Sequence, residues 1–202
     1  MTEQSVNNGG EDLVVSNRNV NLIVDYCLKM GHARSDLLAH LGYPEEYLTN
    51  PDHWISLPIL HEIMKRARKL SNDDPNIFYE IGLRATAEGG LGALEVLKCA
   101  FAVVFADPGL LIKKIPEYNQ FFNRTKDIEI ISSSIGEAKV KVKFRPGINA
   151  VYDFNSGPLV KGVIASIPLV WKLAPAEVEE ILLEYDVVQL LKSHFSIFSE
   201  IK

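Results

Sequence analysis

The sequence predicts a single α+β domain, in which a helical N-terminal half is followed by an antiparallel hairpin or small sheet with a helix packed on it. Its 202 residues suit one domain, and 47% hydrophobic with 23% charged residues is typical of a globular chain. Apolar residues recur at helical spacing from Val20 onward, and the period changes to two between Ile128 and Arg145. These two periodicities, in this order along the chain, favour the α+β class.

The N-terminal residues predict a flexible arm followed by two short helices. Residues 1–16 are mostly polar, so we expect an arm there and the folded domain over 17–202. The next apolar residues fall on one face of a helix that ends at Gly31. A second short helix is expected over 35–41, followed by a loop over 43–52.

Two longer helices each begin with a capping residue and a proline. Ser56 comes shortly before Pro58, and Asp74 directly precedes Pro75, a pattern typical of helix starts. The first helix is expected to bury its apolar residues, namely Ile59, Leu60, Ile63, Met64, Ala67 and Leu70. The second is expected to bury Ile77, Phe78, Ile81, Leu83 and Ala85. A pair of glycines ends this second helix at residue 89.

The central part of the chain predicts two further helices. Residues 94–105 are apolar nearly all round, which indicates a buried helix. Asp107 and Pro108 begin the next helix, which Pro116 is expected to kink or restart before Tyr118.

Alternation over 128–132 and strict alternation over 139–145 predict a β-hairpin with one buried face and one basic, solvated face. Apolar Val140, Val142 and Phe144 alternate with four basic residues, namely Lys139, Lys141, Lys143 and Arg145. We interpret the basic face as a solvated edge that resists aggregation. The alternative is a docking surface for an acidic partner or for nucleic acid.

The C-terminal part predicts a helix and a mixed tail. Residues 156–158 open an apolar helix that Pro168 stops or kinks near Trp171. We expect a strand over 180–187 and a helix over 189–198, while a helix in place of that strand is the alternative.

Charge and composition exclude several classes of protein. Lysine and arginine number 21 against 26 acidic residues, and a net charge of −5 argues against direct nucleic-acid binding by this segment. The start of the chain has no apolar signal region, and no apolar run approaches the about 20 residues of a membrane span. Cys27 and Cys99 cannot form a disulfide framework and suit a reducing compartment, so we expect a cytoplasmic protein.

No motif for catalysis, metal binding or phosphate binding stands out, so we expect neither an enzyme nor a metal site. His61 and Glu62 lack the second histidine of a zinc motif, and the glycines of 89–92 follow no predicted strand. For haem, Cys99 on the most apolar helix is the best candidate for an axial ligand. A buried free cysteine is more often a small hydrophobic residue, so no cofactor is assigned.

Turn and capping residues between His40 and Phe144 follow a recognisable order. This segment contains HLGYPEEYL, the helix start SLP, then EIGLRA, GGLG and a helix begun by Pro108. It resembles the ligand-binding, arabinose-binding-like N-terminal domain of AraC-type transcription regulators and related bacterial signalling input domains. The tail, SGPLVKGVIASIPLVWKLAPAEVEEILLEYD, is similar to the small-molecule-binding domains named after vinyl reductase.

The resemblance implies a sensory domain with a covalently linked output domain. Two features of those families are missing from these 202 residues: the DNA-binding helices of the AraC type and the paired cysteines of the vinyl-reductase type. A metal or cysteine role therefore does not transfer to this chain.

We expect a regulatory input domain that binds a small, mostly apolar or aromatic ligand, or a partner protein, and signals through its C-terminal segment. The residues expected to line the site are Leu97, Cys99, Phe101, Tyr118, Phe122, Trp171 and Tyr185. Each of them is also a plausible core residue. The alternative function is a stand-alone interaction or dimerisation module without a ligand.

The sequence also predicts a homodimer. Large apolar residues follow helical spacing near the C-terminus, and a stripe of this size usually marks a contact surface. The expected contact residues are Leu190, Leu191 and Phe195. The alternative is that this stripe packs back onto the core of its own chain.

Overall fold

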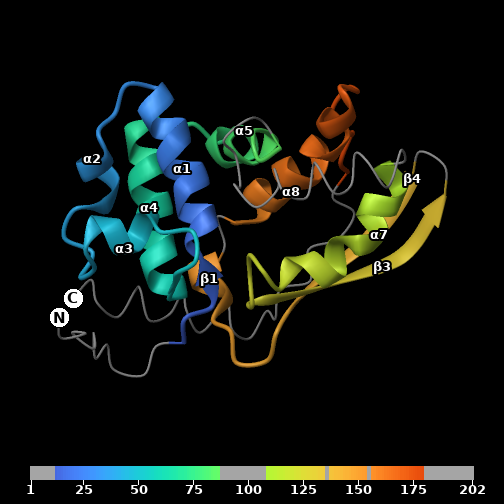
Figure 1. The fold of residues 1–202 in the computed structure, drawn as a ribbon, viewed down its shortest axis with the longest axis horizontal. Helices are drawn as coiled ribbons and strands as arrows, with labels where there is room; N and C mark the ends of the chain where they lie inside the picture. Colours follow the sequence, from blue (N-terminus) through green and yellow to red (C-terminus); the bar gives the residue numbers. More distant parts are fainter. Residues whose placement is uncertain (1–11, 87–107, 135–136, 154–155, 180–202) are drawn as a thin grey trace, which may run out of the picture.

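A computed structural model describes residues 12–86, 108–134, 137–153 and 156–179 of the chain. Among these residues the predicted α+β class is confirmed, with helices through the N-terminal half and a hairpin after them (Figure 1). The helix expected over 94–105 and the tail elements after 179 lie outside the described residues. In chain order the elements are β1 (Val15–Ser16), α1 (Asn17–Lys29), α2 (Arg34–Leu38), α3 (Glu45–Thr49), β2 (Trp54–Ile55), α4 (Leu57–Leu70), α5 (Ile77–Leu83), α7 (Pro108–Asn119), β3 (Lys126–Ser134), β4 (Glu137–Phe144), the 3₁₀ helix η1 (Ala150–Asp153), α8 (Ser156–Ser166) and the 3₁₀ helix η2 (Ile167–Trp171).

The expected flexible arm over 1–16 is wrong for its last residues. Val15 and Ser16 form β1, which pairs antiparallel with β2, and both residues are almost completely buried. The backbone N–H of Val14 donates to Ile55 O at 3.0 Å, and that of Ser16 donates to Phe122 O at 3.0 Å. Pairing on both sides fixes this short strand despite its polar surroundings in the sequence.

Helix α1 matches the predicted pattern, α2 ends three residues earlier than expected, and α3 was not predicted. Helix α1 begins after Ser16, whose Oγ accepts from the N–H of Arg18 at 3.3 Å, and Gly31 follows it with a φ of 92°. The loop expected over 43–52 is wrong, because it contains α3. The first turn of α3 carries two glutamates, and Leu48 anchors it in the core with none of its surface exposed.

Helix α4 begins at its predicted capping residue, whereas α5 begins later than predicted. Helix α4 starts directly after Ser56, as expected. Helix α5 starts two residues later than Asp74 and Pro75 suggest, because Asp74 Oδ1 accepts from the N–H of Asn76 at 2.9 Å and forms a turn first.

Helices α5 and α8 cross with their backbones in contact. A Cβ on Gly82 would lie 2.2 Å from Leu159 O, and a Cβ on Gly162 would lie 2.2 Å from Tyr79 O. Because each glycine faces the other helix, the crossing needs both positions without a side chain. The buried residues of α8 are mostly small; they are Ser156, Leu159, Gly162, Ala165 and Ser166.

Pro116 neither ends nor restarts α7, so the expected restart is wrong. The helix runs from Pro108 to Asn119 with Pro116 inside its last turn. A proline removes the hydrogen bond to the carbonyl four residues before it and its ring crowds that carbonyl, but only three residues of α7 follow Pro116. Pro168, in contrast, does end α8 in the predicted region, and the chain continues as η2.

The hairpin forms over the predicted residues. Strands β3 and β4 pair antiparallel, with Ile128 opposite Val142 and Ile130 opposite Val140. The register shifts after Ile130, which leaves Ile131 in a bulge with 50% of its surface exposed. Helix α7 packs on β3 (Figure 1).

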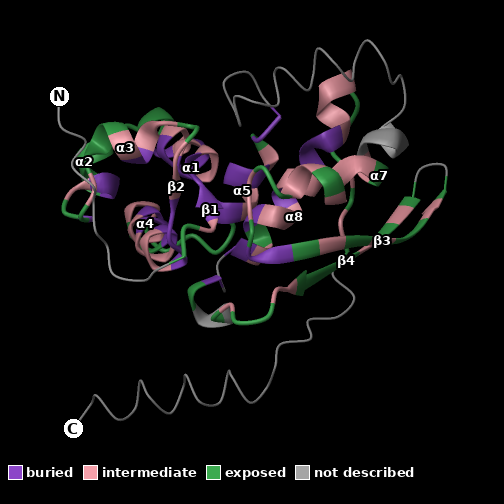
Figure 2. Cartoon of the chain, turned by 60° about the horizontal axis from the view of Figure 1, so that its bottom comes forward, coloured by how far each residue is buried: buried purple, intermediate pink, exposed green. Residues whose placement is uncertain are grey.

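The buried face that we expected on the hairpin is wrong for the described residues. Its apolar side chains are at most half-buried, and Val142 is 41% exposed. Figure 2 shows the contrast, since buried residues concentrate in α1, α4 and the β1–β2 pair while the hairpin is half-buried or exposed beyond its first residues. The main core lies among α1, α4 and α5, and its most buried large side chains are Phe78, Ile23, Leu37, Leu48, Ile55, Ile63, Met64, Ile77 and Ile81.

Candidate functional site

The expected site falls only partly within the described residues. Tyr118, Phe122 and Trp171 are described. The remaining expected lining and dimer residues lie outside the described ranges; they are Leu97, Cys99, Phe101, Tyr185, Leu190, Leu191 and Phe195.

Two of the three described lining residues come together. Tyr118 of α7 and Trp171 of η2 pack with Ile112 and Ile115 around Ile167, which is 6% exposed. We call these five residues the Ile167 cluster. Phe122 packs instead against the main core, and its carbonyl oxygen accepts from Ser16 and Asn19.

The sequence builds the Ile167 cluster from one helix face and one helix break. Ile112, Ile115 and Tyr118 are spaced by three residues, so they lie along the same side of α7. Pro168 converts the end of α8 into η2, and Lys172 closes that turn with a left-handed φ of 59°. The break thereby sets Trp171 against α7.

Trp171 brings one polar group into this apolar cluster. Its Nε1 atom is buried and has no hydrogen-bond acceptor among the described residues. An indole N–H can only donate, and leaving such a donor without a partner costs about 1–3 kcal/mol. A carboxylate or carbonyl oxygen of a bound molecule would satisfy it.

A buried ion pair lies at the base of the hairpin. Lys126 Nζ contacts Asp153 Oδ2 and donates to Ser156 Oγ, and it lies 5.3 Å from the centre of the Phe144 ring. The side chains of Lys126 and Asp153 are 8% and 0% exposed. These three polar residues join the first residue of β3, the last residue of η1 and the first residue of α8.

Sequence reasoning missed this ion pair, although a signal for it existed. Lys126 keeps the even-numbered phase of Ile128 and Ile130, and it stands directly opposite Phe144. A charged residue in phase with a buried face needs a buried partner. The partner, Asp153, lies in a segment whose pattern gave no such indication.

The Lys126–Asp153–Ser156 arrangement serves as a structural clamp. Lys126 Nζ donates to the Ser156 hydroxyl and at the same time pairs with the Asp153 carboxylate. The other carboxylate oxygen of Asp153, Oδ1, has no hydrogen-bond donor within the described part of the chain. Through these contacts the three residues join three segments of the chain.

The charged face of the hairpin is less basic than its β4 sequence suggests. Arg145 Nε lies 2.8 Å from Asp127 Oδ1, and Lys143 Nζ lies 3.2 Å from Glu129 Oε2. These carboxylates of β3 neutralise two of the four basic residues. Within the described ranges Lys139 and Lys141 form no ion pair.

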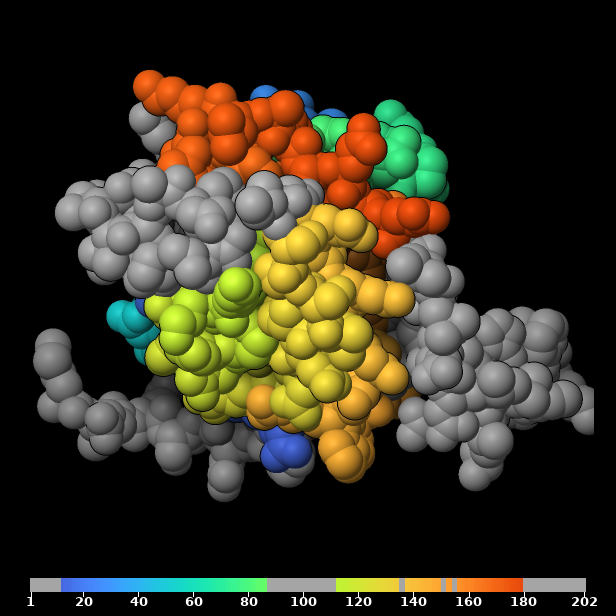
Figure 3. All heavy atoms as spheres, turned by 90° about the vertical axis from the view of Figure 1, so that its right-hand side faces the viewer, coloured from blue at the N-terminus to red at the C-terminus, as the bar shows by residue number. Residues whose placement is uncertain are grey.

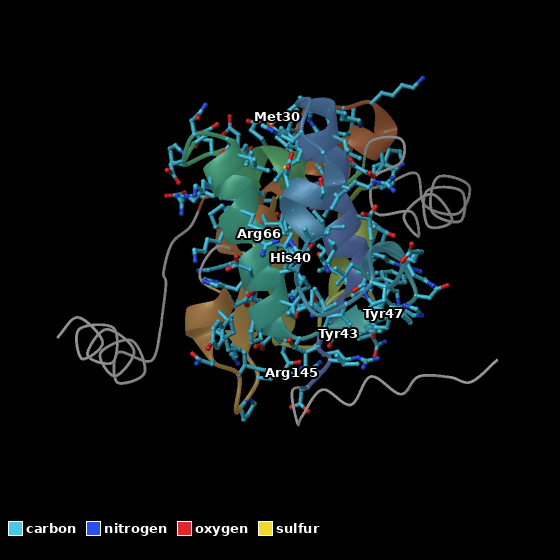
Figure 4. All side chains as sticks on the ribbon, turned by 90° about the vertical axis from the view of Figure 1, so that its left-hand side faces the viewer. Met30, His40, Tyr43, Tyr47, Arg66 and Arg145 are labelled. Atoms are coloured by element: carbon cyan, nitrogen blue, oxygen red, sulfur yellow. The ribbon has the colours of Figure 1, made fainter. Side chains whose placement is uncertain are left out.

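Three aromatic rings near α3, those of Tyr43, Tyr47 and His53, pack against one another. The two tyrosines also pack against the main core. The ring centres of Tyr43 and Tyr47 are 4.9 Å apart, and those of Tyr47 and His53 are 4.3 Å apart. Figure 4 shows the two tyrosines close together at one end of the molecule. The hydroxyl of Tyr47 donates to Trp54 O at 3.0 Å, and burial raises the pKa of this tyrosine.

Metal ligation and thiol chemistry find little support in the described residues. Over 12–86, 108–134, 137–153 and 156–179, no three histidine, cysteine or acidic side chains are grouped so that they could hold a metal ion. Burial raises the pKa of the Cys27 thiol to about 11, which leaves it almost entirely protonated at neutral pH. In the same residues, no helix combines the length and the apolar character needed to cross a membrane.

In comparisons with known proteins, no family model, no curated protein and no solved structure matches this chain.

Proposed function

We propose that this chain is a cytoplasmic regulatory input domain whose Ile167 cluster binds a small, mostly apolar molecule that carries one hydrogen-bond acceptor. The observation that carries the proposal is the buried Trp171 N–H, which finds no acceptor in the described part of the chain and is set among half-buried Ile112, Ile115 and Tyr118. Small-molecule sites typically combine an apolar lining with few polar groups that fix the orientation of the ligand.

The position of the Ile167 cluster suits a signalling role. Trp171 lies at the end of η2, only eight residues before the end of the described chain at Glu179. A ligand that orders η2 would change the path of the residues that follow it. The signal would then pass through the C-terminal segment to an output domain or to a second copy of the chain.

A matched pair of probes tests this proposal. Benzoate and toluene share an aromatic ring, but only benzoate carries an oxygen acceptor. We expect benzoate, or a longer aromatic or fatty acid such as octanoate, to raise the melting temperature of the purified protein, because a ligand of the native state stabilises it. Toluene should raise it less. Absence of a shift with every acid in such a panel would contradict the proposal.

Two single substitutions locate the site. Trp171→Phe keeps most of the apolar contact but removes the N–H donor, so the acid should bind about ten-fold more weakly while toluene is unaffected. Trp54→Phe is the matched control, because Trp54 lies outside the Ile167 cluster. Its ring stacks under the Arg124 guanidinium, whose Cζ atom lies 3.8 Å from the ring centre. If the two variants bound the acid with equal affinity, Trp171 would not be part of the binding site.

A further inference from the structure

The charged face of the hairpin divides into a neutralised half and a basic half. At the base of the hairpin, each basic residue of β4 pairs with an acid of β3 that lies two positions beyond its direct cross-strand neighbour. Lys143 stands opposite Asp127 and pairs with Glu129. Arg145 pairs with Asp127 in the same diagonal way. This half of the face therefore carries little net charge.

The bulge interrupts this series of ion pairs in the outer half of the hairpin. By the same diagonal spacing, the partner of Lys141 would stand at position 131, where the chain has Ile131 in the bulge. Lys139 stands opposite Ser132, which is also uncharged. Both lysines are exposed, and Ile131 is 50% exposed. Two positive charges thus lie close together on β4, and no acid of the described residues pairs with them.

The backbone at the outer edge of β4 adds a second binding feature. The N–H of Arg145 donates to Thr125 O at 2.8 Å. Because the direction of these groups alternates along an antiparallel pair, the N–H and C=O groups of Lys141 face β3, and those of Val140 and Val142 face the other side. No described strand pairs with that side, and Val142 is 41% exposed. Figure 3 shows the hairpin (yellow to gold) at the surface of the molecule.

We propose that the outer part of β4, residues 139–142, binds an extended acidic segment of a partner protein, which adds to the hairpin as a third strand. In this mode of recognition, backbone hydrogen bonds give affinity and alternate side chains give selectivity. Val140 and Val142 supply the backbone groups and an apolar face. Lys139 and Lys141 pair with carboxylates on the other face. The matching segment therefore alternates apolar residues with aspartate or glutamate.

Charge distinguishes this partner from other occupants of the edge. Strand β4 of a second copy would set lysines against lysines, which disfavours pairing of two such edges. A nucleic acid has no peptide N–H and C=O groups to continue the ladder, and the net charge of −5 opposes its approach. An acidic peptide satisfies the lysines and the backbone together. The proposal is independent of a ligand at the Ile167 cluster.

Two designed peptides test the proposal. One is a short acetylated peptide in which valine alternates with glutamate, and the other has lysine in place of glutamate. We expect the purified protein to bind the fluorescently labelled glutamate peptide at least about ten-fold more tightly than the lysine peptide in anisotropy titrations. A peptide with the valines and the glutamates in two separate blocks should also bind more weakly, because its carboxylates cannot alternate. Equal binding of the glutamate and lysine peptides, or no binding, would overturn the proposal.

Hydrogen exchange locates the bound peptide. The glutamate peptide should slow the exchange of the Val140 and Val142 amides by about ten-fold. The amide of Lys141 should change little, because it already faces β3. Peptide binding without this difference would contradict a third strand on β4. Slow exchange of both valines before any peptide is added would mean that this chain or a second copy already covers the edge, which would also overturn the proposal.

Charge reversal supplies a matched pair of variants. Lys139→Glu with Lys141→Glu should weaken binding of the glutamate peptide by about ten-fold or more and favour the lysine peptide. Lys29→Glu with Lys69→Glu is the control, since it changes the net charge equally at exposed positions of α1 and α4. Equal effects of the two pairs would contradict a local site. Binding to phosphatidylserine vesicles that depends on Lys139 and Lys141, without binding of the peptide, would assign this surface to a membrane instead.

Discussion

Helices α1 and α4 and the hairpin β3–β4 are all amphipathic in sequence, yet they bury their apolar faces to different depths. Val20 and Ile23 of α1 and Ile63 of α4 have none of their surface exposed. On the hairpin, Val142 is 41% exposed although it lies on the same face as Ile128, directly opposite it. The chemistry of these side chains is similar, so the difference lies in what covers them.

The covering elements explain the contrast. Helix α1 packs against α3, α4 and α5, so its apolar face is enclosed by other helices. The hairpin packs mainly against α7, which contacts β3 far more than β4. Periodicity therefore tells which face of an element is apolar, whereas burial requires a second layer that the pattern of that element does not reveal.

Helix α8 takes part in two of the contacts that join the two regions. Glycines of α5 and α8 bring the helical region and the C-terminal helix into backbone contact. The Lys126–Asp153–Ser156 clamp then fixes the start of α8 to the start of β3. If these joints hold the hairpin in place, substitutions there should cost more than substitutions on the hairpin itself.

The largest expected effect is that of Lys126→Met. It leaves the Asp153 carboxylate, with a fully buried side chain, without its counter-charge, so we expect the free energy of unfolding to fall by about 3–5 kcal/mol in urea titrations. Lys143→Met is the matched control on the same hairpin. It breaks an exposed pair with Glu129 and should cost at most about 1 kcal/mol.

A double substitution sharpens this result. Replacing both buried partners, Lys126→Met with Asp153→Leu, should recover much of the lost stability, because no buried charge then remains. If Lys126→Met cost no more than Lys143→Met, the ion pair would not join the two regions.

Gly82→Ala is the next largest expected effect. The new Cβ would lie 2.2 Å from the backbone oxygen of Leu159, which cannot rotate away, so α5 and α8 must separate. We expect a loss of about 1–3 kcal/mol in the same titrations. Gly157→Ala in α8 meets nothing within 4 Å and should be neutral or stabilise by up to about 1 kcal/mol. Similar losses for both would contradict the close crossing.

Much of the fold could be predicted from the sequence because its long elements carry strong periodicity. The six apolar positions expected to face inward from α4 belong to the main core or pack against it, and the hairpin residues alternate apart from the bulge at Ile131. Strands β1 and β2 could not be found, since two-residue strands are defined only by pairing between distant segments. The same holds for Gly82 and Gly162, whose role depends on a helix crossing.

The candidate site was less predictable. Aromatic type and position led to Tyr118 and Trp171, but Phe122 has the same character and packs against the main core. Nothing in the sequence indicates that the Trp171 N–H has no acceptor among the described residues, because that depends on how the surrounding groups fold. Lys126 could have been identified from its phase with Ile128, whereas its partner could not.

Arg66→Lys tests how much Arg66 stabilises the end of α2 and the residues that follow it. Arg66 Nη1 donates to Leu37 O at 3.1 Å and to Ala39 O at 2.6 Å, next to His40 with its left-handed φ of 61° (Figure 4). A lysine keeps the charge but lacks the planar fork, so we expect a loss of about 1–2 kcal/mol and faster amide exchange in α2. Lys69→Gln on the exposed side of α4 should change neither.

The smallest expected effect is the pH dependence contributed by Glu62. A hydrogen bond from Arg66 lowers the pKa of this carboxyl below its ordinary value of 4.5, against a smaller opposing effect of burial. Because the pKa is lower in the folded chain, the ionised carboxylate stabilises the fold above pH 4.5, and this contribution disappears as the pH falls through the folded value. The side chain is 38% exposed, so solvent screening limits the contribution to about 0.3 kcal/mol. Glu62→Gln should therefore be slightly less stable than the unmodified protein in urea titrations at pH 7 and equally stable at pH 3. A difference that persisted at pH 3 would have to come from packing of the glutamate stem and not from its charge.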